Sequence, residues 1–401
     1  MQKAYSIVLL LLICISYSCK PGSEGSAQFA DQVQLPEKEF YEFEVRKNLD
    51  KAEEILLSTI AEQIRYIPLE TTSSCLLSRC RQVEIFNNKI FVKDSKALYK
   101  FDMDGRFIQQ IGKIGNGPGE YGSVLWFNFI ASTNEIILYS YPTGRINIHD
   151  AGSGEFKRSF RLDIEPCGVV EFPPGKLSFL TWNTRQSESQ NSNPEIYFCT
   201  LEGTILDSIS DERVPRTGNI SGPVRYYIHN ETLCYKDFFQ DTLYSISNEA
   251  KKEAYVSFGL ENKAHGNELE MTRLIGEIQF PDHLIIGKVL ENESSFYFTV
   301  EMGLGFHISS EEQKFLFNKN AGQLFSCDSL TNDLDGGIPI WPESIYKDSL
   351  LIDFYPAIEF LEFFQTHPEN PGRTQELNDL INTLDENDNP VVILASHAED
   401  H

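Results

Sequence analysis

The chain has 401 residues, a formal net charge of −25 and a hydrophobic fraction of 41%. This apolar content is enough for a packed core and argues against a globally disordered chain. The acidic balance argues against nucleic acid as a partner, because phosphate binding depends on neutralisation by Lys and Arg. It also argues against peripheral docking on anionic lipid.

The first residues are typical of a secretory signal peptide, which we assign to residues 1–18. Lys3 supplies a positive charge, and the apolar run Ile7–Ile15 is too short to span a bilayer as a helix. The small residue before Cys19 resembles a bacterial lipobox and predicts lipidation of Cys19, although Ser16 stands where such motifs usually carry Leu. The alternative is an ordinary cleaved signal with an incidental cysteine.

Residues 19–62 are predicted to form a lipidated tether and N-terminal extension, with a short helix across Leu49–Ile60. Cys75 and Cys80 are close enough in sequence to form a disulfide, which an oxidising compartment permits. No Cys or His pair has the spacing of a zinc site, and we predict neither a metal nor a cofactor. The remaining cysteines are interpreted as buried apolar side chains: Cys167, Cys199, Cys234 and Cys327.

From Ile64 onward, short runs rich in Ile, Val, Phe and Tyr alternate with turn residues, which is typical of β-strands. Val83–Gly112 and Phe127–Phe160 each contain four such runs, with a Gly-containing turn at the same place before the fourth. Weaker copies follow at Val169–Ser210, Tyr226–Gly259, His283–Asn318 and Leu324–Asp353. Four strands per repeat is the unit of a β-propeller blade.

The repeats predict an all-β fold, a six-bladed β-propeller over residues 63–401. We expect the strands Ile64–Leu69 and Pro390–Ala395 to share the sixth blade, because closure by N- and C-terminal strands removes exposed sheet edges. Tyr355–Thr366 and Thr374–Leu384 are expected to be short helices that pack against the rim of that blade. The alternative, a pair of β-sandwich domains, does not explain the repeated four-strand units.

Motifs spread over nearly the whole mature chain, taken together in their order and spacing, resemble a known group, the six-bladed β-propeller lipoproteins of Bacteroidota-type bacteria, with NHL-like repeats. The motifs are Tyr66–Thr71, Phe101–Phe107 with Gly115–Tyr121, Asp241–Ile246 with Phe258-Gly259, and Asn332–Gly337 with Asp388–Val392. The resemblance implies the fold and a lipoprotein address. It implies no activity, since distant relatives with NHL-type repeats bind proteins, RNA or small ligands and a few propellers are enzymes.

Strand direction alternates within a blade, so the turn between strands two and three and the link to the next blade lie on one face. The loops expected there are longer and richer in Tyr, Trp, Phe and Arg than those of the opposite face, and function usually resides on such loops. The candidate ligand-face residues are Asn116, Glu120, Tyr121, Tyr141, Trp182, Arg185, Phe238 and Asp241.

Two motifs in these loops are interpreted as structural. Gly115–Tyr121 lacks the Lys-Ser/Thr ending of a phosphate-binding loop and no helix follows it, so we interpret it as an inter-blade turn. Glu120 and Tyr121 could still reach a ligand from this turn. Asp333–Gly337 fails the register of an EF-hand, because the twelfth position would be Pro342 rather than Glu, and solvated turns are the favoured account.

The sequence contains neither a Gly-x-Ser-x-Gly nor a His-Glu-x-x-His motif, and we assign no catalytic residue. We therefore expect a lipid-anchored binding module of the cell envelope, for a glycan, a peptide or a partner of a nutrient-uptake system. The alternative is a polysaccharide lyase or hydrolase, which needs titratable side chains that converge at the central channel. The expected location is the outer membrane, with the periplasmic side favoured over the cell surface because only one acid, Glu24, follows closely after Cys19.

Overall fold

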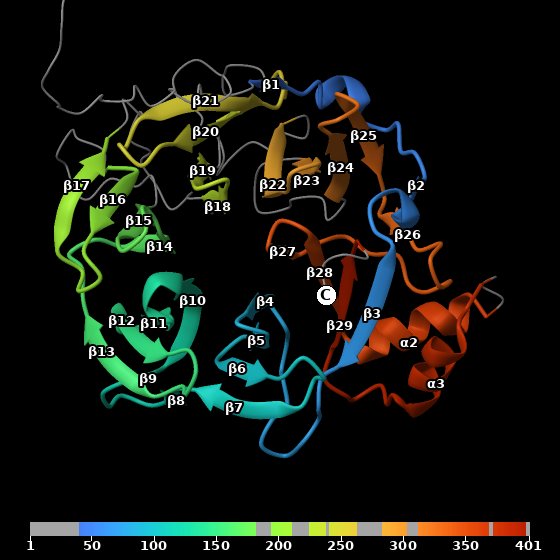
Figure 1. Ribbon diagram of the computed structural model, residues 1–401, viewed down its shortest axis with the longest axis horizontal. Coiled ribbons are helices and arrows are strands. Elements are labelled where there is room, and N and C mark those ends of the chain that lie inside the picture. Colours follow the sequence, from blue (N-terminus) through green and yellow to red (C-terminus); the bar gives the residue numbers. More distant parts are fainter. Residues whose placement is uncertain are drawn as a thin grey trace, which may run out of the picture. The chain divides into compact units, whose positions relative to one another are not determined.

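The computed structural model describes residues 40–181, 194–210, 224–237, 240–262, 283–302, 312–368 and 372–397. Within these residues, six mainly antiparallel sheets stand around a common axis (Figure 1). The domain is a six-bladed β-propeller with two short helices near the C-terminus, so the predicted fold class is confirmed.

The first three blades each run in sequence order from the strand nearest the axis to the outermost strand (Figure 1). Blade one contains β4 (Gln82–Phe86), β5 (Lys89–Lys93), β6 (Leu98–Phe101) and β7 (Phe107–Ile111). Blade two contains β10 (Ser123–Ile130), β11 (Glu135–Tyr141), β12 (Arg145–Asp150) and β13 (Phe156–Phe160). Blade three contains β14 (Pro166–Glu171), β15 (Leu177–Thr181), β16 (Ile196–Cys199) and β17 (Ile205–Ile209).

The remaining blades include the two that use N-terminal segments of the chain. Blade four contains β18 (Arg225–His229), β19 (Thr232–Lys236), β20 (Thr242–Ile246) and β21 (Lys252–Ser257), with β1 (Tyr41–Glu42) added at its outer edge. Blade five contains β22 (Leu284–Glu291), β23 (Ser295–Met302), β24 (Glu312–Asn318) and β25 (Gln323–Cys327). Blade six contains β27 (Ser344–Tyr346), β28 (Leu350–Tyr355), β29 (Val391–Ser396) and β3 (Gln63–Pro68).

The division between blades five and six differs from the sequence prediction. The predicted sixth repeat began at Leu324, but β25 is the outermost strand of blade five, and blade six begins only at Ser344. The sequence pattern places a strand of blade five at 305–310, which lie outside the described residues, whereas β24 and β25 are the two outer strands of that blade. In the link between these two blades, β26 (Leu330–Thr331) pairs in parallel with β2 (Ile55–Leu56) from the N-terminal part of the described chain.

Closure of the ring follows the prediction. β29 pairs with β28 on one side and with β3 on the other, so strands from both ends of the described chain share one sheet. All six residues of β29 are buried. The buried Asn389 side chain, just before β29, fastens the link to blade one: its amide donates to the carbonyls of Glu70 (2.7 Å) and Cys75 (2.9 Å) and its oxygen accepts from the amide of Leu77 (2.9 Å).

The sequence motifs Tyr66–Thr71 and Phe101–Phe107 meet where blade six contacts blade one. The amide of Glu70 donates to the carbonyl of Gly105 (2.8 Å), and the Glu70 carboxylate accepts from the amide of Phe107 (2.7 Å). Gly105 has a φ of +81°, and a Cβ there would lie 2.2 Å from the carbonyl oxygen of Pro68. Glycine is therefore required at this turn both by its backbone conformation and by the close approach of β3.

Deletion of 389–401 should prevent cooperative folding, because it removes Asn389 and leaves β28 and β3 without a common neighbour. Each buried aliphatic side chain contributes about 1.5–3 kcal/mol, so the loss is comparable to a domain's net stability of about 5–15 kcal/mol. Deletion of 28–40, which ends just before β1, should change the melting temperature little. Thermal melts of both truncations, compared with the mature chain, test this. Equal melting temperatures would contradict closure by β29.

The segment 40–62, here called the strap, is more ordered than the predicted tether. It contains β1, η1 (Arg46–Asn48), β2 and η2 (Leu57–Thr59), so the helix expected across Leu49–Ile60 is wrong. The reason is its alternating pattern: Ile55 and Leu57 are buried while Leu56 between them is exposed, which suits extended backbone rather than a helix.

Phe43 is the main apolar anchor of the strap. β1 pairs in parallel with β21, and this pairing places the Phe43 ring in the core between blades four and five. The ring lies 4.5 Å from that of Phe317 and 5.5 Å from those of Phe296 and Phe298, measured between centroids. Residues 40–62 therefore belong structurally to the propeller.

Substitution Phe43→Ala should lower the free energy of unfolding by about 3–5 kcal/mol, the usual loss when a buried aromatic ring is removed from a core. Phe40→Ala is the matched control, since Phe40 is 49% exposed against 3% for Phe43. Urea denaturation of both variants measures the difference. Equally small losses of unfolding free energy in both variants would mean that the strap does not stabilise the propeller.

The two helices lie where the sequence predicts them. α2 (Ala357–Thr366) and α3 (Gln375–Thr383) are inserted between β28 and β29. Phe360 and Phe364 of α2 and Leu377 of α3 share an apolar cluster with Ile393 of β29, and the same cluster includes buried residues of the strap and of blade five. The helices thus cover the outer part of the closing blade (Figure 1).

Asp353 on β28 is a buried carboxyl whose two oxygens accept hydrogen bonds from the backbone amides of Trp341 (2.8 Å) and Phe354 (2.7 Å). Burial raises its pKa to about 7. The unfolded chain releases this proton near pH 3.9 (about the model-peptide value), so the folded state holds more protons between these two values.

The contribution of Asp353 to stability should therefore fall as the pH rises from about 4 to 7 and then level off, because the state that holds more protons is favoured at low pH. Asp353→Asn should remove this contribution and so change the slope of stability against pH, whatever its effect on stability at any one pH. Urea denaturation of both proteins at pH values across the range gives the two slopes. Parallel pH profiles would contradict the assignment.

Cys75 and Cys80 are free thiols in the structure, so the expected disulfide is not formed there. Burial raises the pKa of each to about 12. Because the thiolate is the species that reacts to form disulfides, both groups are poorly placed for oxidation. Cys199, Cys234 and Cys327 are buried and Cys167 is half-buried, which agrees with their interpretation as apolar side chains.

Candidate functional site

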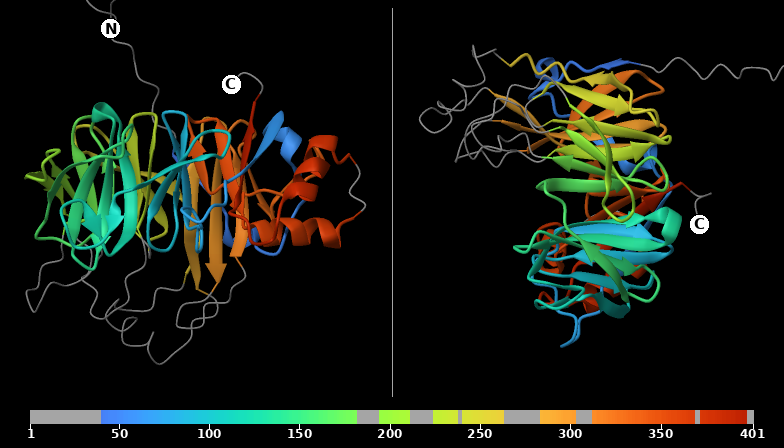
Figure 2. Two further views of the ribbon diagram at one scale, coloured as in Figure 1. Left: turned by 90° about the horizontal axis from the view of Figure 1, so that it is seen from below. Right: turned by 90° about the vertical axis from the view of Figure 1, so that its left-hand side faces the viewer.

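The face that carries the candidate residues, here called the loop face, contains the connections between strands two and three and the links between blades. Figure 2 shows the strands running between this face and the opposite one, and the first residue of each innermost strand lies at its loop-face end. The opposite face has short turns, such as the hairpin at Asn87 and Asn88, whose φ values are 48° and 54°. Asn tolerates this left-handed conformation, so tight turns suffice there.

The predicted ligand-face residues fall into three groups. Asn116 and Tyr141 are exposed, Tyr141 to 58%. Glu120, Tyr121 and Asp241 are engaged in internal hydrogen bonds. The others, Trp182, Arg185 and Phe238, lie outside the described residues, as does Cys19.

The Gly115–Tyr121 turn is closed by its own side chains. The Glu120 carboxylate accepts from the amide of Gly117 (2.7 Å), and the buried Tyr121 hydroxyl donates to the carbonyl of Ile111 (2.7 Å). The turn also contains the parallel pair β8 (Lys113–Ile114) and β9 (Glu120–Tyr121). These contacts account for the motif as an inter-blade turn.

Asp241 has a similar internal role at blade four. Both carboxylate oxygens accept from the amide of Leu260, at 3.2 and 3.3 Å, which ties the start of β20 to the chain after β21. Burial raises the pKa of Asp241. The carboxyl thus shapes the loop face near the strap.

A group of charged side chains that the sequence did not single out lies on, or immediately before, four of the innermost strands. Lys288 of β22 donates to the Glu343 carboxylate and to its backbone carbonyl (3.0 Å), and Glu343 immediately precedes β27. The two side chains are 35% and 38% exposed, so this ion pair joins blades five and six without being sealed from solvent.

Glu84 of β4 brings a second carboxyl to this pair from blade one. Burial raises its pKa, while the Lys288 ammonium and the Gln82 amide, which donates to it at 3.1 Å, act in the opposite direction. The Glu343 carboxylate adds to the rise because two like charges lie close together. Glu84 is therefore the group of this set best placed to hold a proton at higher pH than an ordinary carboxyl.

Arg225 at the start of β18 contributes a cation from blade four. Its Nε donates to the carbonyl of Gly287 in blade five. Burial lowers the pKa of Arg225, and the carboxylates of Glu301 and Glu312 oppose this by attraction. We call Gln82, Glu84, Arg225, Lys288 and Glu343 the axial cluster, because all lie on or directly beside innermost strands (Figure 1).

A signal for the axial cluster exists in the sequence. Innermost strands are rich in apolar residues, yet Glu84, Arg225 and Lys288 interrupt or begin three of them. Such a charge needs a partner, because an unpaired buried charge is costly. Among the described residues, no group of three or more His, Cys, Asp and Glu side chains could hold a metal ion. No helix in the described part of the chain is long and apolar enough to cross a membrane.

The six blades, closed by strands from both ends of the described chain, make this domain a six-bladed β-propeller. Residues 40–396 match the model of the family described as Domain of unknown function (DUF4934), and the chain belongs to that family.

Among solved structures, a protein from Bacteroides fragilis that is classed as exported is similar, with 18% identity and a TM-score of 0.64, over 88% of this chain and 98% of that one. A member of the DUF4221 family from Bacteroides vulgatus has 11% identity and a TM-score of 0.49, over 84% of this chain and 96% of that one. No curated protein matches the sequence. At these identities the likeness concerns the fold.

Proposed function

We propose that the protein is a lipid-anchored binding module of the cell envelope that holds a glycan or peptide at the axial cluster. The observation that carries this proposal is the convergence of charged side chains from blades one, five and six near the axis, with Arg225 of blade four bonded to the backbone beside Lys288. The stability of the fold does not require charges at these positions, since partly exposed ion pairs contribute little net stability.

The chemistry of the axial cluster suits a polar ligand. Lys288 and Arg225 can donate hydrogen bonds, Glu84 and Glu343 can accept them, and all four are half-exposed. Tyr141, exposed on the same face, offers an aromatic surface of the kind on which sugar rings and side chains stack. Such a mixture of donors and acceptors suits a hydroxyl- or amide-rich ligand.

The anchor and the location rest on the N-terminal sequence. The signal peptide and the lipobox-like Cys19 support lipidation at the outer membrane, and the single acid after Cys19 supports the periplasmic side. The exported class of the Bacteroides fragilis protein of similar fold agrees with passage out of the cytoplasm. A protein anchored there could have a component of a nutrient-uptake system as its partner.

The test is a glycan and peptide array probed with the mature chain, followed by affinity measurements on variants. The double variant Lys288→Gln with Glu343→Gln removes one charge of each sign, so the net charge is unchanged. We expect it to weaken binding tenfold or more, the loss of about one charge-assisted hydrogen bond. The control is Lys251→Gln with Glu253→Gln, an exposed ion pair of the same composition in blade four, which should leave the affinity within about twofold.

Unchanged binding by the Lys288→Gln, Glu343→Gln variant would place the ligand elsewhere. A failure to bind any glycan or peptide, without a co-purifying membrane partner, would defeat the proposal.

The same ligands test the alternative function, a polysaccharide lyase or hydrolase. The raised pKa of Glu84, which lies beside the Glu343 carboxylate, is the observation that favours it. Cleavage of a bound glycan that is lost in Glu84→Gln, while binding persists, would establish the enzyme instead.

A further inference from the structure

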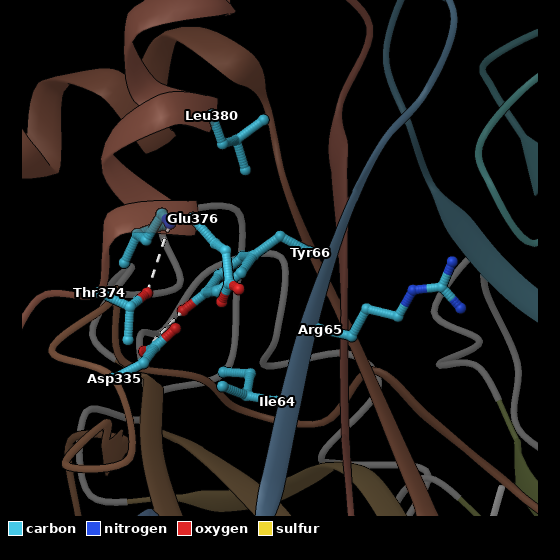
Figure 3. A pocket seen from close by; sticks show the side chains of 8 residues that line it. Ile64, Arg65, Tyr66, Asp335, Thr374, Glu376 and Leu380 are labelled. Carbon is cyan, nitrogen blue, oxygen red and sulfur yellow. Dashed lines mark hydrogen bonds between the residues drawn. The ribbon is translucent and has the colours of Figure 1, made fainter.

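A cavity of about 250 Å³ lies at the outer edge of blade six, and none of the residues that line it belongs to the axial cluster (Figure 3). It is lined by β3, by the first turns of α3 and by the Asn332–Gly337 loop. One water molecule occupies about 30 Å³ in the liquid, so the cavity has room for a small organic group. Its apolar wall is formed by Ile64, Leu377 and Leu380.

Asp335 is the polar centre of this cavity. Its side chain is held by three hydrogen bonds to Oδ1, from the Tyr66 hydroxyl (3.1 Å), the Asn332 amide (2.8 Å) and the backbone amide of Gly337 (3.0 Å). The residue is only 9% exposed. All three of these bonds use Oδ1 and none uses the second oxygen, Oδ2, of this cavity-lining residue.

The charge of the cavity is negative. Glu376 extends its carboxylate from the first turn of α3 toward Tyr66 and Asp335, whereas Arg65 points away from them (Figure 3). The Arg65 guanidinium is held instead by the carbonyl of Met103 (2.9 Å) and the carboxylate of Asp104 (3.1 Å). Burial raises the pKa of Asp335, while its hydrogen bonds from Asn332, Gly337 and Tyr66 act in the opposite direction.

We propose that this cavity binds a primary ammonium group on a short aliphatic chain. The ammonium would contact Oδ2 of Asp335 and the Glu376 carboxylate, and the aliphatic chain would lie against Ile64, Leu377 and Leu380. A primary ammonium has three donors, which matches two carboxylates and leaves one bond for water. A neutral or anionic head group of the same size would leave the buried carboxylate uncompensated.

Asp335→Asn separates the binding role from the structural one. The carbonyl oxygen of Asn can keep the three bonds made to Oδ1, while its NH₂ group replaces the available acceptor with a donor. Glu376→Gln removes the second carboxylate at an exposed position, where little stability depends on it. Glu386→Gln is the matched control, because Glu386 is an exposed acid close in sequence that does not line the cavity.

The experiment titrates the mature chain with n-butylammonium, n-butanol and butyrate, with methyl NMR of Ile64, Leu377 and Leu380 as the readout. We expect saturable shifts with n-butylammonium, at least tenfold weaker binding for n-butanol and none for butyrate. Asp335→Asn should lose tenfold or more in affinity and Glu376→Gln severalfold, with Glu386→Gln unchanged. Binding should also tighten as the pH rises, since the carboxylate is the form that attracts the cation.

Equal binding of n-butanol and n-butylammonium, or an equal loss in Glu386→Gln and Glu376→Gln, would overturn the proposal. If Asp335→Asn melts well below the parent protein, the comparison of Glu376→Gln with Glu386→Gln and the comparison of the three probes still test the proposal. N-acetyl-lysine methylamide, titrated in the same way, distinguishes the source of the ammonium. Tighter binding than that of n-butylammonium indicates a lysine side chain of a polypeptide, and weaker binding indicates a free amine.

Discussion

The antiparallel pairing of β29 with β3 is the contact on which the rest of the structure depends. The two strands come from opposite ends of the described chain, and only their pairing converts a row of sheets into a ring. β29 lies between β28 and β3, so its backbone groups are satisfied on both sides. The features nearest to it serve the same contact: Asn389 fastens the link to blade one, and α2 and α3 cover the apolar face of the closing blade.

A closed ring fixes the distances between its innermost strands, and the axial cluster is a consequence. Lys288 and Glu343 belong to neighbouring blades, while Glu84 comes from the blade beyond. These groups meet only because six sheets of similar width complete one turn. The strap contributes from outside, since Phe43 fills the core between blades four and five and resists their separation. The packing of Phe43 between two blades therefore also helps to hold the innermost strands, and with them the axial cluster, in place.

Much of the fold could be predicted because its signals are local: alternating apolar residues mark strands, and Asn- or Gly-containing turns mark hairpins. The strap could not, since Phe43 and Ile55 are single apolar residues in a polar segment, whose partners lie in distant blades. The axial cluster needed coordinates, because Glu84 and Lys288 are remote in sequence. Tyr121 shows the same limit at a loop, where a sequence does not reveal whether an aromatic ring faces solvent or, as here, the core.

The position of β3 in the last blade has a consequence for how the protein is made. β3 emerges from the ribosome before β4, whereas its partner β29 follows all the other described strands. Blades one to five can form in order behind β3, but the ring stays open until β29 has been made. An unpaired strand edge must therefore persist while the five intervening blades are synthesised.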